Sequence, residues 1–151
     1  MAGKTNSKHI RVYMDSTGGT VRHISRAVTN IAGVGLEYNE TDVTGYSDGI
    51  INFTLGHPRS EIEITGPLDN TALASSPSHS GPHLVFTSIL GDESATYTLT
   101  VEFGIKAAPT TGDPTFTGEY VCSKYTINGD GTYTARLVPG STTAPSFGTK
   151  S

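Results

Sequence analysis

The chain has 151 residues, a formal net charge of −4 and one cysteine, Cys122. This length predicts one domain, and a single cysteine excludes an intrachain disulfide. Lys and Arg form no basic run, which disfavours a duplex-binding protein because phosphate neutralisation supplies most of such affinity. Hydrophobic residues make up only 34% of the chain, so we expect a domain that either is loop-rich or completes its burial against neighbours.

The beginning of the chain favours a protein made in the cytoplasm that does not contact membranes. Residues 1–8 are predicted to be a flexible segment and lack the apolar core of a signal peptide. No apolar run approaches the ~20 residues of a membrane span. The predicted domain then covers residues 9–139, and residues 140–151 are predicted to form a flexible polar tail.

The first half of the chain is predicted to be mostly extended. The segment Val21 to Ile31 has apolar residues at helical spacing, but its β-branched content also allows two short extended pieces. The strands expected in this half are Ile10 to Met14, Leu36 to Thr44, Ile50 to Leu55 (ended by Gly56-His57-Pro58) and Ser60 to Thr65 (ended by Gly66-Pro67).

The clearest strand is Ala95 to Gly104, in which apolar residues alternate with Thr and Glu. Before it, the Ser- and Pro-rich segment 70–81 is predicted to be a loop. His83 to Leu90 follows Pro82 and precedes Gly91, an arrangement typical of a short helix.

The last predicted elements form a β-hairpin. Phe116 to Ile127 and Thr132 to Pro139 are joined by Asn128-Gly129-Asp130-Gly131, which supplies the positive φ that tight turns need. Lys106 to Pro114 is predicted to be irregular. Together these patterns predict a mainly β, antiparallel sandwich or barrel-like single domain with one short flanking helix.

No residue pattern indicates catalysis, a cofactor or a metal. His79 and His83 are close in sequence, but zinc sites use three or four ordered ligands, so a solvated loop is the expectation. The glycine pairs complete no nucleotide-binding pattern, and no nucleophile motif occurs. Cys122 lies in a β run beside tyrosines and is expected to be a buried, inert thiol. We therefore expect a non-enzymatic protein.

The order of several segments resembles the tail tube (major tail) subunits of long-tailed bacteriophages. The resemblance spans about residues 20–140. Its parts are Glu40 to Gly49 with its Asp-Val-Thr, Ser60 to Asp69, the helix-like His83 to Leu90 before a strand ending in Phe103-Gly104, Gly112 to Val121, and the closing hairpin with Asn128 to Gly131.

The resemblance implies a structural virion protein. Such subunits self-assemble into rings, commonly hexameric, that stack into a conduit for DNA delivery and contact other tail proteins. The passing DNA is not specifically bound. The alternatives within a virion are a capsid decoration (cement) protein and a head–tail joining protein. Outside it, a carbohydrate-binding β-sandwich module remains possible, although such modules usually expose aromatic residues and Trp is absent.

This interpretation assigns two sets of candidate site residues. Glu61, Glu63 and Glu102 lie on the polar faces of predicted strands, where carboxylates facing a channel would repel phosphate. An ordinary solvated outer face is the alternative for each of them. The loop 70–81 is the candidate ring-stacking element, through Asn70, Ser75, Ser78 and Gly81.

Overall fold

The computed structural model describes residues 7–151 as one mainly β domain with antiparallel sheets and one short α-helix, as predicted. In chain order, the elements are η1 Ser7–His9, β1 Ile10–Asp15, β2 Val21–His23, η2 Ser25–Ala27, β3 Asn30–Ala32, β4 Glu37–Asp42, β5 Phe53–Arg59, β6 Ile62–Pro67, α1 Pro82–Ile89, β7 Tyr97–Phe103, β8 Pro114–Ile127, β9 Thr132–Pro139 and β10 Ser146–Thr149.

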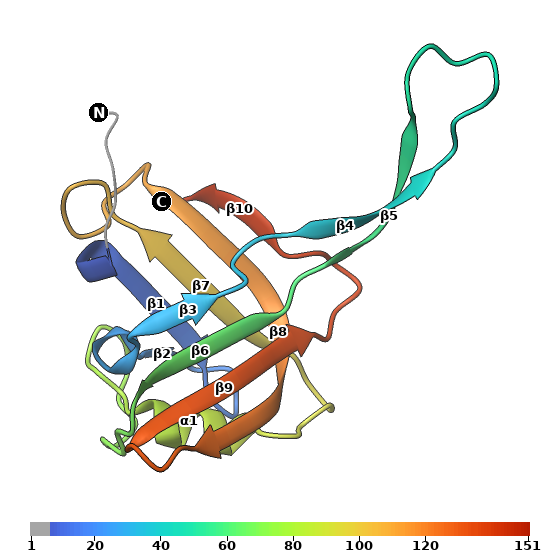
Figure 1. Cartoon of the computed structure of the whole chain (residues 1–151). Coiled ribbons are helices and arrows are strands. Elements are labelled where there is room, and N and C mark those ends of the chain that lie inside the picture. The colour runs from blue at the N-terminus through green and yellow to red at the C-terminus, as the bar shows by residue number, and fades with distance from the viewer. Residues whose placement is uncertain (1–6) are drawn as a thin grey trace.

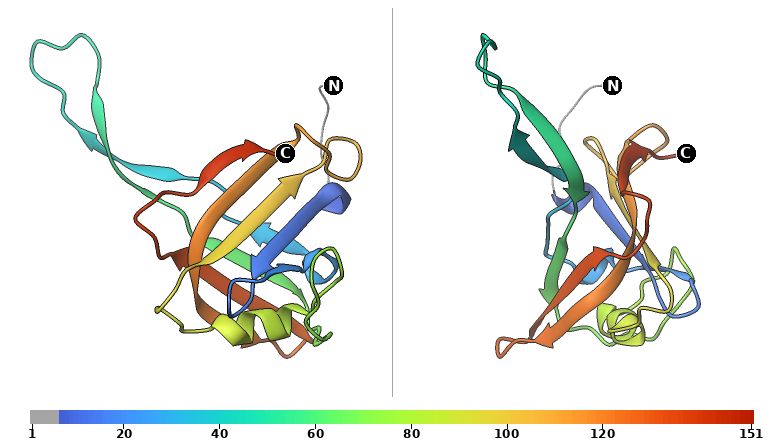
Figure 2. Two further views of the ribbon diagram at one scale, coloured as in Figure 1. Left: turned by 180° about the vertical axis from the view of Figure 1, so that it is seen from behind. Right: turned by 90° about the vertical axis from the view of Figure 1, so that its right-hand side faces the viewer.

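A single bent sheet forms the body of the molecule (Figure 1). Its strand order is β2-β1-β7-β8-β9-β6-β3, and β10 pairs with β8 outside this path. Strand β8 is 14 residues long and pairs with β7 up to Tyr120 and with β9 from Tyr120 onward. Because one long strand serves two neighbours in succession, the sheet folds over on itself into two layers, which Figure 2 shows from the side.

The core lies between these layers. Tyr97, Leu99 and Val101 of β7 face it, in agreement with the predicted alternation. The second strand of the closing hairpin buries Tyr133, Ala135 and Leu137, also as predicted. Helix α1 covers one end of the core with Val85, Phe86 and Ile89.

The local signals for α1 and for the closing hairpin are confirmed. Pro82 occupies the first turn of α1, and Gly91 follows the helix with a φ of 72°. In the hairpin turn, Asn128 and Thr132 pair through their backbones, and Gly131 adopts a φ of 82°. Of the two possibilities for residues 21–31, the extended one is correct, with η2 between β2 and β3.

Two predicted strand ends are wrong. β5 continues through Gly56-His57-Pro58 to Arg59, and β6 includes Gly66-Pro67. Pro58 has no N–H to donate, but β5 pairs only with β4, and the register shifts next to the Tyr38–Pro58 pair. Proline is tolerated at such edges and irregularities, so it does not end this strand.

The prediction of a flexible tail over 140–151 is also corrected. Residues Ser146–Thr149 form β10, which pairs antiparallel with the first residues of β8. The Phe147 ring packs edge-on against buried Phe116, with 5.0 Å between the ring centroids. The predicted flexible segment 1–8 lies largely outside the described residues; its last two residues belong to η1.

Cys122 is buried, as predicted, and burial raises the pKa of its thiol to about 11. At neutral pH the protonated thiol is a poor nucleophile. We predict that a thiol reagent such as 5,5′-dithiobis(2-nitrobenzoate) modifies the native protein at least 100-fold more slowly than the protein unfolded in guanidinium. Comparable rates before and after unfolding would contradict the buried position.

Candidate functional site

The three predicted channel-facing glutamates do not share one environment. Glu63 is exposed on β6, opposite Arg136 of β9 in the sheet register. Glu61 is also exposed, and its carboxylate forms ion pairs with Arg59 (3.3 Å) and Arg136 (2.8 Å). These arginines lower the pKa of Glu61 through hydrogen bonds and charge. A patch that contains Glu61 and Glu63 is therefore locally neutralised rather than strongly acidic.

Glu102 differs from the prediction of a solvated strand face. Its accessibility is only 8%, and its carboxylate accepts a 2.9 Å ion-pair hydrogen bond from the Lys150 ammonium. The pKa of Lys150 is raised, chiefly by this bond. The end of the chain therefore covers Glu102, and in this subunit the carboxylate has an internal structural partner.

The predicted stacking loop 70–81 is held closely against the body. Ser80 is buried, its hydroxyl hydrogen-bonds to the backbone of Ala74, and its N–H donates to the carbonyl of His23. Gly81 is buried as well, and an added Cβ there would lie 2.5 Å from the carbonyl oxygen of Asp69. Of the four predicted contact residues, Asn70, Ser75 and Ser78 are exposed, whereas Gly81 is not available to a neighbour.

The two histidines considered for a metal have separate partners. His79 Nε2 lies 2.7 Å from an Asp69 carboxylate oxygen, and His83 Nδ1 lies 3.0 Å from the Tyr125 hydroxyl. Within residues 7–151, no group of three or more His, Cys, Asp or Glu side chains is arranged to hold a metal ion. Over the same residues, no helix combines the length and the apolar character that crossing a membrane would require.

The most distinctive surface is a β-hairpin that leaves the body. We call residues 37–58 the arm: it contains β4, nearly all of β5 and the turn between them, and β4 and β5 pair only with each other. Figure 1 shows the arm projecting far beyond the bent sheet. The molecule exposes 8648 Å², compared with about 7300 Å² expected for a compact monomer of this mass. The arm, exposed along almost its whole length, contributes to this excess.

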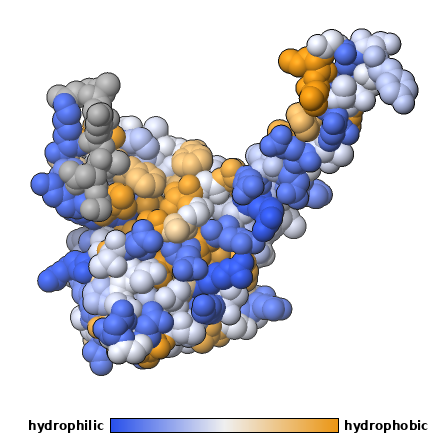
Figure 3. Space-filling view, in the orientation of Figure 1, coloured by the Kyte–Doolittle hydropathy of each residue, from blue (hydrophilic) through white to orange (hydrophobic). Residues whose placement is uncertain are grey.

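The arm exposes large apolar side chains that the body does not cover. The exposed fraction reaches 74% for Ile50 and 65% for Leu55. The complete set is Tyr38, Val43, Tyr46, Ile50, Ile51, Phe53 and Leu55. Figure 3 shows hydrophobic surface near the far end of the arm and a second patch on the body. Exposed apolar patches of this kind mark interaction sites in soluble proteins.

The pairing of β4 with β5 sorts the side chains onto two faces. Glu40 lies opposite Leu55, and Asp42 lies opposite Phe53, so these four share one face. Thr41 and Thr54 lie opposite each other on the other face. One face of the arm therefore combines two apolar side chains with two carboxylates.

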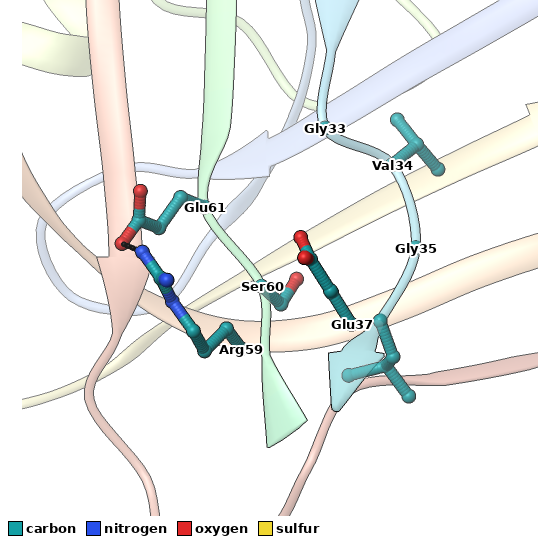
Figure 4. A pocket seen from close by; sticks show the side chains of 8 residues that line it. Gly33, Val34, Gly35, Glu37, Arg59, Ser60 and Glu61 are labelled. Atoms are coloured by element: carbon teal, nitrogen blue, oxygen red, sulfur yellow. Dashed lines mark hydrogen bonds and ion pairs between the residues drawn. The ribbon is translucent and has the colours of Figure 1, made fainter. Parts of the chain in front are cut away.

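The root of the arm is fixed to the body by close contacts. The Ser60 hydroxyl is buried and lies 2.7 Å from the Tyr120 hydroxyl at the bend of the sheet. A Cβ on Gly33 would lie 1.9 Å from the carbonyl oxygen of Glu61, so only glycine allows these two backbones to approach. Figure 4 shows the open hollow of about 330 Å³ beside these residues, where Arg59 and Glu61 bond to each other. The hollow marks the junction between arm and body.

The residue pattern predicts both strands of the arm but does not indicate that the arm is a site. One signal was available: β4, with the sequence Glu-Tyr-Asn-Glu-Thr-Asp, lacks the alternate apolar row that a strand needs to cover a core. A strand without such a row buries little apolar surface, so packing against the core does not hold it on the body.

The fold and the arm define a class: a small antiparallel β domain that carries an exposed apolar hairpin. No family model matches the chain, and no curated protein matches it. Among solved structures, the chain is similar to the cap that terminates the tube of the anti-feeding prophage. The TM-score is 0.64 at 8% sequence identity, over 99% of this chain and 94% of that chain. At this identity the likeness shows a shared fold.

Proposed function

We propose that the chain is a structural protein of a phage-like tail and works in a virion by assembling with copies of itself and with other tail proteins. The observation that carries this proposal is the arm, whose large apolar side chains are left exposed by the rest of residues 7–151. The similarity in fold to a tube-terminating cap supports the choice of a tail rather than another assembly. The proposal assigns no catalytic activity to the chain.

Within this class we favour a tail tube subunit that forms stacked rings, expected to be hexameric, through which DNA passes. The exposed Glu61 and Glu63 remain candidates for the channel face, and Asn70, Ser75 and Ser78 remain candidates for contacts between rings. A terminal cap is the second candidate, because the similar cap matches this chain over nearly the full length of both.

Electron microscopy of the concentrated, purified protein tests the proposal and separates the two candidates. A tube subunit has complementary surfaces on both sides of its ring, so rings stack without a fixed limit as concentration rises. A cap forms single rings or pairs of rings that do not grow further. A chain that stays monomeric at millimolar concentration in light scattering would contradict both.

A further inference from the structure

The charges of the molecule are distributed unevenly between the arm and the body. The arm contains Glu37, Glu40, Asp42 and Asp48 and no Lys or Arg, so it carries a formal charge of −4. Outside the arm, the remaining 10 acidic residues equal the 10 Lys and Arg in number, so the rest of the chain is formally neutral. The arm thus accounts for the whole net charge of the protein.

The acidic side chains of the arm are exposed. Hydrogen bonds from Thr44 lower the pKa of Asp42, and Asp48 accepts hydrogen bonds from the Gly45 N–H and the Asn52 amide. At the root, Arg59 pairs with Glu61 of the body, which also pairs with Arg136. Two arms that approached each other would bring like charges together, so pairing between arms is unfavourable.

The side of the body opposite the arm is cationic. We call residues 8–26, which run from η1 through β1 and β2 into η2, the cationic edge. It contains Lys8, Arg11, Arg22 and Arg26 and a single carboxylate, Asp15, which is buried. Figure 1 and the left-hand view of Figure 2 show these elements on the side of the body away from the arm.

Nearby carboxylates cancel only part of this charge, because Asp69 beside Arg26 is ionised at neutral pH. Glu102, which lies opposite Arg11 in the sheet register, is buried and paired with Lys150. Asp69, which lines a hollow together with Arg26, is bonded to His79 and Thr71. These bonds hold the pKa of Asp69 at about 2. Arg11 and Arg22 donate hydrogen bonds only to uncharged oxygens, those of Lys8, Ile10 and Ser16, and neither forms an ion pair within residues 7–151. Their charges are therefore available to an acidic partner surface.

A groove with a mixed apolar and polar lining lies beside the cationic edge. It is lined by Ile10, Val12, Val28 and Ile31 together with polar residues of the segment 25–30. Ile10, Val28 and Ile31 are partly exposed although they pack against the core. The adjoining strand β3 pairs on one side only, with β6, so its other edge can accept further backbone hydrogen bonds.

We infer that the arm of one subunit docks on the cationic edge and the adjoining groove of a second copy, head to tail. Phe53 and Leu55 supply the apolar part of the contact, and Glu40 and Asp42 on the same face approach the arginines. Because donor and acceptor surfaces lie on opposite sides of the subunit, the contact is heterologous and closes into a ring when the rotation per subunit allows it. This inference rests on the proposed self-assembly and specifies its partner surface.

Exchanging the charges tests the inference. The arm variant carries Glu40→Lys and Asp42→Lys, the two carboxylates on the face of Phe53 and Leu55, and the edge variant carries Arg11→Glu and Arg26→Glu. Each variant alone is expected to self-associate at least tenfold more weakly than wild type at low salt, measured by analytical ultracentrifugation. An equimolar mixture of the two is expected to recover association to within about threefold of wild type, because opposite charges again face each other. Lys124→Glu, an exposed change on β8, is the control and is expected to have no effect.

The outcomes separate the inference from the proposed function. An edge variant that associates like wild type, or a mixture no better than its components, would place the arm elsewhere and overturn the inference while leaving assembly intact. If the wild-type protein does not self-associate at all, that result would instead contradict the proposed function. If a variant unfolds, the wild type still gives a test. Raising salt from 50 to 500 mM is expected to weaken association at least tenfold, and an unchanged affinity would overturn the inference.

Discussion

Replacing Phe53 and Leu55 with Ser is expected to lower self-association at least 100-fold while leaving the stability of the subunit unchanged. Both side chains are more than half exposed in the single subunit, so removing them costs the folded domain little. When a partner covers them, each contributes about 1.5–3 kcal/mol, and together this is a factor of roughly 100 or more. Sedimentation measures the association, and thermal unfolding measures the stability.

A matched control distinguishes loss of the arm contact from a general loss of surface hydrophobicity. Leu90 and Ile127 are also exposed but lie on the body, and Leu90→Ser with Ile127→Ser removes similar apolar area. This pair is expected to associate like wild type. If the body variant lost association and the arm variant kept it, the arm would not be the assembly element.

The elements that the sequence predicted well are those governed by contacts close in sequence. The alternation in β7, the Pro and Gly around α1 and the turn after Asn128 are local signals, and each is confirmed. The predicted strand ends at Gly56-His57-Pro58 and Gly66-Pro67 are wrong, because whether proline or glycine ends a strand depends on the neighbouring strand with which it pairs. Both prolines lie where a missing N–H is tolerated.

The features that the sequence did not predict depend on contacts far along the chain. Glu102 becomes buried because Lys150, 48 residues away, pairs with it. β10 pairs with the edge of β8, where Phe147 packs against Phe116, a residue that is also distant in sequence. The arm is the extreme case. It projects because its strands make few contacts with the body, and a residue pattern indicates missing contacts only indirectly.

The second large effect is expected at Gly66, where β6 passes under η2. A Cβ at this position would lie 2.0 Å from the carbonyl oxygen of Ala27 and 2.8 Å from its carbonyl carbon. These are backbone atoms, so relief requires η2 to move rather than a side chain to rotate. The same carbonyl accepts the hydrogen bond of the buried Tyr133 hydroxyl at 2.9 Å, and the Thr29 N–H donates to the Thr65 carbonyl at 2.8 Å. A shift of η2 strains both bonds.

Gly66→Ala is therefore expected to lower the free energy of unfolding by about 3 kcal/mol, which corresponds to a fall in Tm of roughly 10 °C. Gly129→Ala is the matched control, because a Cβ at Gly129 meets nothing within 4 Å and its φ is not in the left-handed region. That variant is expected to stay within about 0.5 kcal/mol of wild type in urea unfolding. Since η2 carries Arg26 and borders the groove proposed to receive the arm, folded Gly66→Ala protein is also expected to associate more weakly. Equal stabilities for the two alanine variants would mean that η2 does not lie against β6 as described.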